Sequence, residues 1–166
     1  MIFVSVGTQL AFDRLITAVD AWAASSPDRK VFAQIGPSRL QPRHIEHAQF
    51  LSPQECIEQM TAAEAVVAHA GIGTILTALE LGKPLLVMPR RADLGEHRND
   101  HQLATARRFA ALGRVSVAFD ELDIASKLDE LHQLAARPQI SAEAPQDFVA
   151  ALRAFIAGQS LSPTPK

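Results

Sequence analysis

The sequence VVAHAGIGTILTALELGKPLLVMPRRADLGEHRNDH, residues 66–101, contains two short apolar runs of the kind that form buried strands. A glycine-containing turn and an amphipathic segment lie between the two runs, and a polar, charged segment follows the second. Continuous apolar runs bounded by turn residues are typical of strands buried on both faces of a parallel sheet. The stretch therefore predicts a strand, a glycine turn, a helix, a second strand and a polar loop, in that order.

The same alternation continues on both sides of this stretch. Apolar runs predict strands at residues 2–6, 31–35, 65–68, 84–88 and 115–119, with a weak edge strand near residues 49–51. Helical spacing predicts helices at residues 12–25, 74–81, 100–112, 124–135 and 146–157, and another that begins at Pro53 and turns Ile57, Met60 and Ala63 toward the sheet. We therefore expect the α/β class, with a single Rossmann-like open parallel sheet and helices on both faces. Residues 1–157 are expected to form one domain, and residues 158–166 a disordered tail.

Composition limits the classes of protein and partner. The 166 residues suit one domain, and a formal net charge of −2 without a basic stripe makes nucleic acid an unexpected partner. The one cysteine, Cys56, allows no disulfide within the chain and favours a cytosolic setting; we interpret it as a buried structural thiol. The N-terminus predicts a first strand rather than a signal peptide, and no run approaches the roughly 20 apolar residues of a membrane span. Membrane contact is therefore expected to be peripheral or through a partner.

Polar and glycine residues gather where the predicted strands end, at Gly7, at Gly36, and in residues 69–74 and 89–101. The carboxyl ends of parallel strands meet at one edge of a sheet, and ligands bind outside that edge. We therefore expect these four loops to converge on one binding site.

Two glycines in the turn Ala70-Gly71-Ile72-Gly73-Thr74 allow the backbone to turn sharply and to approach a ligand closely. The following helix would point its free N–H groups at that ligand, and its dipole favours an anion such as a phosphate. The alternative is a tight turn in which Thr74 only caps the helix. The pattern is neither a dinucleotide-binding fingerprint nor a P-loop.

The loop from Pro89 carries a high density of hydrogen-bonding side chains, including Arg90, Arg91 and Glu96. A solvated loop is the plain interpretation, but sugar hydroxyls or a pyrophosphate would need such groups, and the two arginines would neutralise a phosphate or a carboxylate. His97 and His101 have the spacing of half a zinc site. Asn99 and Asp100 favour a helix start between the two histidines, however, so we expect no metal there.

These motifs together resemble a known family. HAGIGTILTALELGKPLLVMPR and GEHRNDHQ, with VSVGTQLAFDRLI and QIGPS before them, resemble the nucleotide-sugar-binding half of MurG-like GT-B glycosyltransferases, the C-terminal domain of glycosyltransferase family 28. The resemblance covers about residues 1–113 and is strongest for single-domain, donor-binding subunits of two-subunit bacterial exopolysaccharide or capsule enzymes. These subunits are similar to the catalytic subunit of the eukaryotic N-acetylglucosaminyltransferase of dolichol-linked oligosaccharide synthesis.

The resemblance implies a UDP-sugar donor and no metal or other cofactor. It places Gly71, Ile72, Gly73 and Thr74 at the diphosphate, Asn99, His101 and Gln102 at the donor sugar and phosphates, Gly7, Thr8 and Gln9 near the reacting centre, and Gly36 near the uracil. We add His69, Arg90, Arg91 and Glu96 to the candidate site from their places in the two loops. The family usually has a ribose-binding glutamate where this chain has Thr77, so we include Thr77 as its replacement.

The resemblance also implies that this chain is one half of an enzyme. A membrane-anchored subunit would bind a lipid-pyrophosphate-linked saccharide acceptor, and the complex would lie at the cytoplasmic face of the plasma membrane. Residues Phe148, Leu152, Phe155 and Ile156 form a stripe on the last predicted helix that would dock this subunit, or that would pack on the chain's own sheet.

Three functions remain as hypotheses. The leading one is a transferase subunit whose general base lies beside Gln9 or on the partner; Arg90 and Arg91 would suit an acidic sugar such as glucuronic acid. The others are a UDP-sugar epimerase or hydrolase on the same fold, and a non-catalytic regulatory subunit that binds nucleotide sugars.

Overall fold

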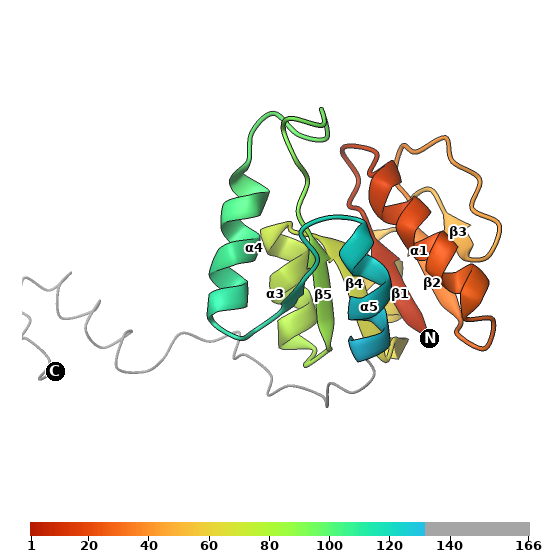
Figure 1. The fold of residues 1–166 in the computed structure, drawn as a ribbon. Helices are drawn as coiled ribbons and strands as arrows, with labels where there is room; N and C mark the ends of the chain where they lie inside the picture. Colours follow the sequence, from red (N-terminus) through yellow and green to blue (C-terminus); the bar gives the residue numbers. More distant parts are fainter. Residues whose placement is uncertain (132–166) are drawn as a thin grey trace, which may run out of the picture.

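Parallel strands form one open sheet through the centre of the protein in the computed structural model, which describes residues 1–131 (Figure 1). The strands are β1 (Ile2–Ser5), β2 (Val31–Gln34), β3 (Glu46–Ala48), β4 (Ala65–His69), β5 (Leu85–Met88) and β6 (Ser116–Val117). Their order across the sheet is β3-β2-β1-β4-β5-β6, and every neighbouring pair is parallel. This confirms the predicted fold class.

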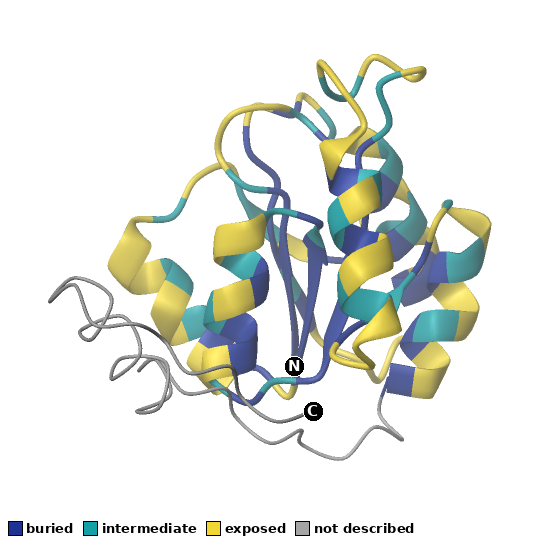
Figure 2. Cartoon of the chain, turned by 90° about the vertical axis from the view of Figure 1, so that its left-hand side faces the viewer, coloured by how far each residue is buried: buried dark blue, intermediate teal, exposed yellow. Residues whose placement is uncertain are grey.

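Helices cover both faces of the sheet. They are α1 (Asp13–Ser25), α2 (Pro53–Ala62), α3 (Ile72–Glu80), α4 (His101–Ala111) and α5 (Leu122–Leu131). Helices α1 and α5 lie side by side on one face, whereas α3 and α4 lie on the opposite side in Figure 1. Figure 2 shows the buried strands between the exposed outer sides of the helices.

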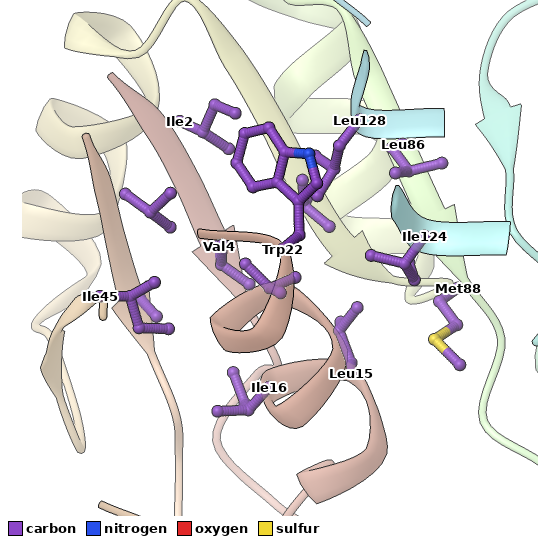
Figure 3. Close-up of a cluster of buried hydrophobic side chains, with 14 of the residues drawn as sticks. Ile2, Val4, Leu15, Ile16, Trp22, Ile45, Leu86, Met88, Ile124 and Leu128 are labelled. Atoms are coloured by element: carbon purple, nitrogen blue, oxygen red, sulfur yellow. The ribbon is translucent and has the colours of Figure 1, made fainter. Parts of the chain in front are cut away.

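Alternate strand residues enter two separate hydrophobic clusters. Ile2 and Val4 of β1 pack with α1 and α5, where Trp22 and Leu128 meet above the sheet (Figure 3). Phe3, between them in sequence, points to the other cluster, which α2, α3 and α4 cover. The central strands β1, β4 and β5 are buried on both faces, which is why the sequence shows continuous apolar runs there rather than alternation.

The direction of chain progression reverses between β1 and β4. From β1 the chain adds β2 and β3 on one side, and it then adds β4, β5 and β6 on the other. The loops after β1 and β4 therefore diverge to opposite faces at adjacent carboxyl ends, where open α/β sheets bind ligands.

Local differences from the sequence prediction have physical causes. The edge strand lies at Glu46–Ala48 rather than at residues 49–51. Its sequence is largely polar, so no apolar pattern marks its position. Helix α3 begins at Ile72, two residues before Thr74, because Gly71 provides the extended N-cap. Ile57 is 47% exposed instead of facing the sheet, whereas Met60 and Ala63 are buried as expected.

Some predictions concern residues outside the described part of the chain. These are the end of the helix at 124–135, the helix at 146–157 with its Phe148, Leu152, Phe155 and Ile156 stripe, and the tail at 158–166. The extent of the domain to residue 157 likewise stays a prediction. Within residues 1–131, no helix is both long enough and apolar enough to cross a membrane.

Candidate functional site

A cavity of about 530 Å³ lies at the carboxyl ends of β1 and β4. Most of the predicted site residues line it: Gly7, Thr8, Gln9, His69, Gly71, Gly73, Thr74, Arg90, His101 and Gln102. The structure thus brings three of the four predicted loops, those after β1, β4 and β5, together at one edge, whereas Gly36 in the loop after β2 is not among the lining residues. No carboxylate is among the lining residues of the described chain.

His69 ends β4 and lies between the two glycine loops. Its Nδ1 is 3.3 Å from the carbonyl oxygen of Ser5, which can accept a hydrogen bond only from the Nδ1–H tautomer. A Cβ at Gly7 would lie 2.9 Å from the imidazole Cε1, and one at Gly71 would overlap Nε2. Both glycines are therefore needed for the ring to fit. Burial lowers the pKa of His69 to about 4, so the ring is neutral at physiological pH.

Two sets of backbone N–H groups face this region without acceptors in residues 1–131. One set is the first turn of α3, where Ile72, Gly73 and Thr74 precede the first intrahelical bond, from Ile75 to Gly71, and no side chain caps the helix. The other is the loop after β1, where the N–H groups of Thr8 and Gln9 donate to no atom of the described residues. Free amides at a helix N-terminus attract anions.

A further part of the cavity lining comes from a segment that the sequence motifs did not place at the site. Leu51, Pro53 and Cys56 line it. A capping box fixes the start of α2, since Ser52 Oγ accepts from Glu55 N–H and the Glu55 carboxylate accepts from Ser52 N–H. A helix start at Pro53 was predicted from the sequence, but only the strand order shows that this start reaches the same edge of the sheet.

Histidines from the loop after β5 complete the cavity. The rings of His97 and His101 meet edge to face with centroids 4.5 Å apart. The sequence suggested His97 only as a metal ligand; it lines the cavity, and its Nδ1 is the buried side-chain polar atom without a hydrogen-bond partner in residues 1–131. Burial, followed by the charges of His101, Arg90 and Arg98, lowers the pKa of His97.

Gln102 presents a defined hydrogen-bonding group. Its Oε1 accepts from the backbone N–H of Arg90 at 3.1 Å, and the residue is 4% exposed. Because an amide oxygen rather than an NH₂ group must accept this bond, the NH₂ group is left for other partners. Gln102 is therefore a donor at the cavity.

Two charged residues predicted for the site lie outside the cavity lining. Glu96 accepts two bonds from Arg14, at 2.8 Å each, and one from Arg91 N–H, so its carboxylate holds the loop rather than facing a ligand. The Arg91 side chain is exposed and pairs with Asp93.

The other predicted residues outside the lining are Gly36, Ile72, Thr77 and Asn99. Thr77 donates its hydroxyl to the carbonyl of Gly73, one turn earlier, and Asn99 Oδ1 contacts the Nδ1 of His101. Gly36 has a φ of 60° and adjoins Gly7, and Ile72 has an exposed side chain. A ribose or uracil role for Thr77 and Gly36 stays a prediction. In the described residues, no three His, Cys, Asp or Glu side chains form a group that could hold a metal ion.

Residues 1–154 match the glycosyltransferase family 28 C-terminal domain, and the chain belongs to this family. It is similar to the UDP-N-acetylglucosamine transferase subunit ALG13 of Eremothecium gossypii, with 49% identity over 33% of this chain and 25% of that protein. It is also similar to the subunit of the same name from Homo sapiens, with 30% identity over 69% of this chain and 10% of that protein. The matches thus span only a quarter and a tenth of the length of these relatives.

A solved structure shares the fold. The chain aligns with the solution structure of ALG13 at a TM-score of 0.61 and 19% identity, over 86% of this chain and 90% of that one. At this identity the likeness concerns the fold alone.

Proposed function

We propose that this chain, as a member of glycosyltransferase family 28, is the donor-binding subunit of an enzyme that transfers a sugar from a UDP-sugar. One observation carries this proposal. Among residues 1–131, no carboxylate lines the cavity, and two sets of backbone N–H groups without an acceptor and one buried arginine meet there. That combination suits a diphosphate, which carries negative charge and accepts many hydrogen bonds.

The two walls of the cavity give the donor an orientation. The diphosphate would lie between the Thr8–Gln9 loop and the start of α3, with Gly73 open to it, since a Cβ there meets nothing within 4 Å. The nucleobase would pack against the more apolar wall of Leu51, Pro53 and Cys56. The sugar would then lie toward His101 and the NH₂ group of Gln102.

The chemistry follows from this placement. The acceptor hydroxyl oxygen attacks the anomeric carbon, the bond from that carbon to the diphosphate oxygen breaks, and UDP leaves with the negative charge. The N–H groups of Thr8, Gln9, Gly73 and Thr74 would stabilise that charge. Because no carboxylate of the described residues lines the cavity, we assign the base that takes the hydroxyl proton to a cavity histidine or to a group of the partner.

The acceptor and the partner are finer parts of the proposal. Two relatives are named as transferase subunits, which supports a second chain that completes the enzyme. The motif resemblance supports a lipid-pyrophosphate-linked acceptor, a membrane-anchored partner subunit and a place at the cytoplasmic membrane face. It also supports a role in bacterial exopolysaccharide or capsule synthesis, although both relatives come from eukaryotes.

Binding and thiol labelling test the donor site. Calorimetry should show that UDP and UDP-sugars bind, and that inorganic diphosphate competes. Because Cys56 is the one cysteine and lines the proposed base site, saturating UDP should slow its labelling by a maleimide several-fold. Diphosphate alone should slow the labelling less. Failure of every uridine nucleotide to bind would reject the proposed function. Binding of UDP without protection of Cys56 would show that the uracil contacts another part of the cavity.

A further inference from the structure

The side chain of Arg90 ties together the loop that leaves β1. Arg90 lies two residues beyond β5 and is 2% exposed. Its Nη2 donates to the carbonyls of Val6 at 2.8 Å and Leu10 at 2.7 Å, and its Nη1 donates to the carbonyl of Ala11. Its guanidinium carbon also lies 4.6 Å from the centroid of the Phe12 ring. One side chain therefore holds both ends of the loop that carries the cavity glycine.

These bonds determine which groups the loop presents to the cavity. The carbonyls of Val6, Leu10 and Ala11 turn toward the guanidinium. The N–H groups of Thr8 and Gln9, at the crest of the loop, have no acceptor in the described chain. Arg90 therefore holds the carbonyls inward and leaves the crest amides for a ligand.

Arg90 is also a buried cation without a bonded carboxylate in residues 1–131. Its hydrogen-bond acceptors are neutral carbonyls, and the carboxylate of Glu96 is held by Arg14. Burial lowers the pKa of Arg90 to about 10, against the opposing effect of Glu96, so the group stays charged at neutral pH. A buried charge without a counter-ion is costly, and an anion in the adjacent cavity would offset that cost.

We propose that Arg90 is a positioning residue for the donor diphosphate. It holds the Thr8–Gln9 amides in place, and its buried positive charge at the cavity is neutralised by the diphosphate. The sequence alone suggested a direct ion pair with a phosphate or an acidic sugar. The structure instead assigns three of the guanidinium N–H groups to backbone carbonyls. This inference rests on the proposed function, because it requires a nucleoside diphosphate in the cavity.

If Arg90 positions the diphosphate, the loss of affinity on its substitution should depend on the phosphate charge of the ligand. Uridine, UMP and UDP share the base and ribose and differ in phosphate charge, so calorimetric titration of each separates charge from shape. For Arg90→Gln, uridine should bind within about twofold of the wild-type affinity, whereas UDP should bind about tenfold or more weakly, which is about 1.4 kcal/mol. Equal losses for uridine and UDP would indicate a purely structural role and would overturn the inference.

Arg91→Gln is the matched control. Arg91 adjoins Arg90 in sequence, but its side chain is exposed and pairs with Asp93, so its loss should leave the preference for UDP over uridine unchanged. A loss of that preference as large as in Arg90→Gln would show that nearby charge alone is responsible, and would overturn the positioning role.

Arg90→Lys separates the two parts of the proposal. It keeps the charge but cannot donate to three carbonyls in one plane, so it should recover part of the UDP affinity while hydrogen exchange at Thr8 and Gln9 stays faster than in the wild type. Circular dichroism first checks that each variant folds. If Arg90→Gln does not fold, the test of the positioning role rests on Arg90→Lys. Hydrogen exchange at Thr8 and Gln9 as slow as in the wild type would then overturn the inference. Wild-type protein that binds no UDP would reject the proposed function itself.

Discussion

A side chain at Gly73 would project into the cavity rather than into the protein. The structure leaves open space where its Cβ would be, so Gly73→Val should fold normally while it blocks the approach of the diphosphate to the start of α3. We expect UDP to bind at least about tenfold more weakly, or about 1.4 kcal/mol, with little change in melting temperature. Calorimetry measures the affinity, and thermal denaturation measures the melting temperature. Unchanged affinity would show that the start of α3 does not bind the diphosphate.

Gly71→Ala provides the contrast, because its Cβ would overlap Nε2 of His69. This variant should lose stability as well as affinity, so the two glycines of one turn have different roles. A variant at Gly71 that melts like the wild type would show that His69 can move aside.

Stability should depend on the protonation of His69. Burial lowers its folded-state pKa from 6.5 to about 4, so below pH 6.5 the unfolded chain takes up a proton that the folded chain excludes. The contribution of neutral His69 is complete above pH 6.5 and is lost as the pH falls toward 4, up to about 3 kcal/mol. Urea denaturation at pH 7 and pH 4.5 should show this loss in the wild type and a smaller one in His69→Asn. Parallel losses in both proteins would contradict the assignment.

Residue types were predictable from the sequence, but their partners were not. Gly7, Gly71 and Gly73 were identifiable because they lie in short turns that follow predicted strands, where glycine permits a sharp turn and a close backbone approach. The roles of Glu96 and Arg90 depend on atoms far away in sequence: Arg14 and Glu96 are 82 positions apart, and Arg90 and Val6 are 84 apart. No local pattern specifies which of several charged residues meets a ligand and which meets the backbone.

At the scale of elements, Arg14 of α1 connects three segments. It donates twice to Glu96 in the loop after β5, once to the carbonyl of Pro89 and once to Glu121 before α5. The side chains of Arg14 and Glu96 are each 12% exposed, so this ion pair is shielded from water. It therefore fixes the loop that brings His97 and His101 to the cavity.

Loss of this ion pair should loosen the loop. Glu96→Gln should lower the free energy of unfolding by about 1 to 3 kcal/mol, since charged hydrogen bonds contribute about that much. Hydrogen exchange in residues 91–100 should accelerate. Glu121→Gln is the control, because the Glu121 side chain is 48% exposed and should contribute less than about 1 kcal/mol. Equal effects of the two substitutions would mean that the loop does not depend on Glu96.

Strands that are buried on both faces could be located accurately from the sequence, whereas the exposed edge strand could not, and the reason is physical. Strands β4 and β5 are buried on both faces, so residues 65–68 and 85–88 are apolar without interruption. Strand β3 has one neighbour and polar residues, which leaves only its backbone bonds to define it. The contribution of α2 to the cavity was missed, because it arises from the reversal of strand order rather than from any motif in α2 itself.

At the scale of the whole molecule, the cavity lies at the edge of the sheet where the carboxyl ends of the strands meet. Its lining comes from the loops after β1, β4 and β5 and from the start of α2. No carboxylate among the described residues lines it. A sugar transfer needs an acceptor hydroxyl held against the anomeric carbon and a base to take its proton. The described lining residues include the neutral side chains of His69 and Gln102 but no carboxylate that could take this proton.

We therefore expect the chain to bind its donor and yet to turn over little or not at all by itself. Transfer of radiolabelled sugar from UDP-sugars to lipid-linked acceptors should appear only when a membrane-anchored partner encoded beside this chain is co-expressed. Gly73→Val in the same complex should remove transfer without removing the complex, because it acts at the donor cavity. Robust transfer by the chain alone would reject the two-subunit proposal. UDP release without an acceptor would favour a hydrolase, whereas donor binding without transfer under any partner condition would favour a regulatory subunit.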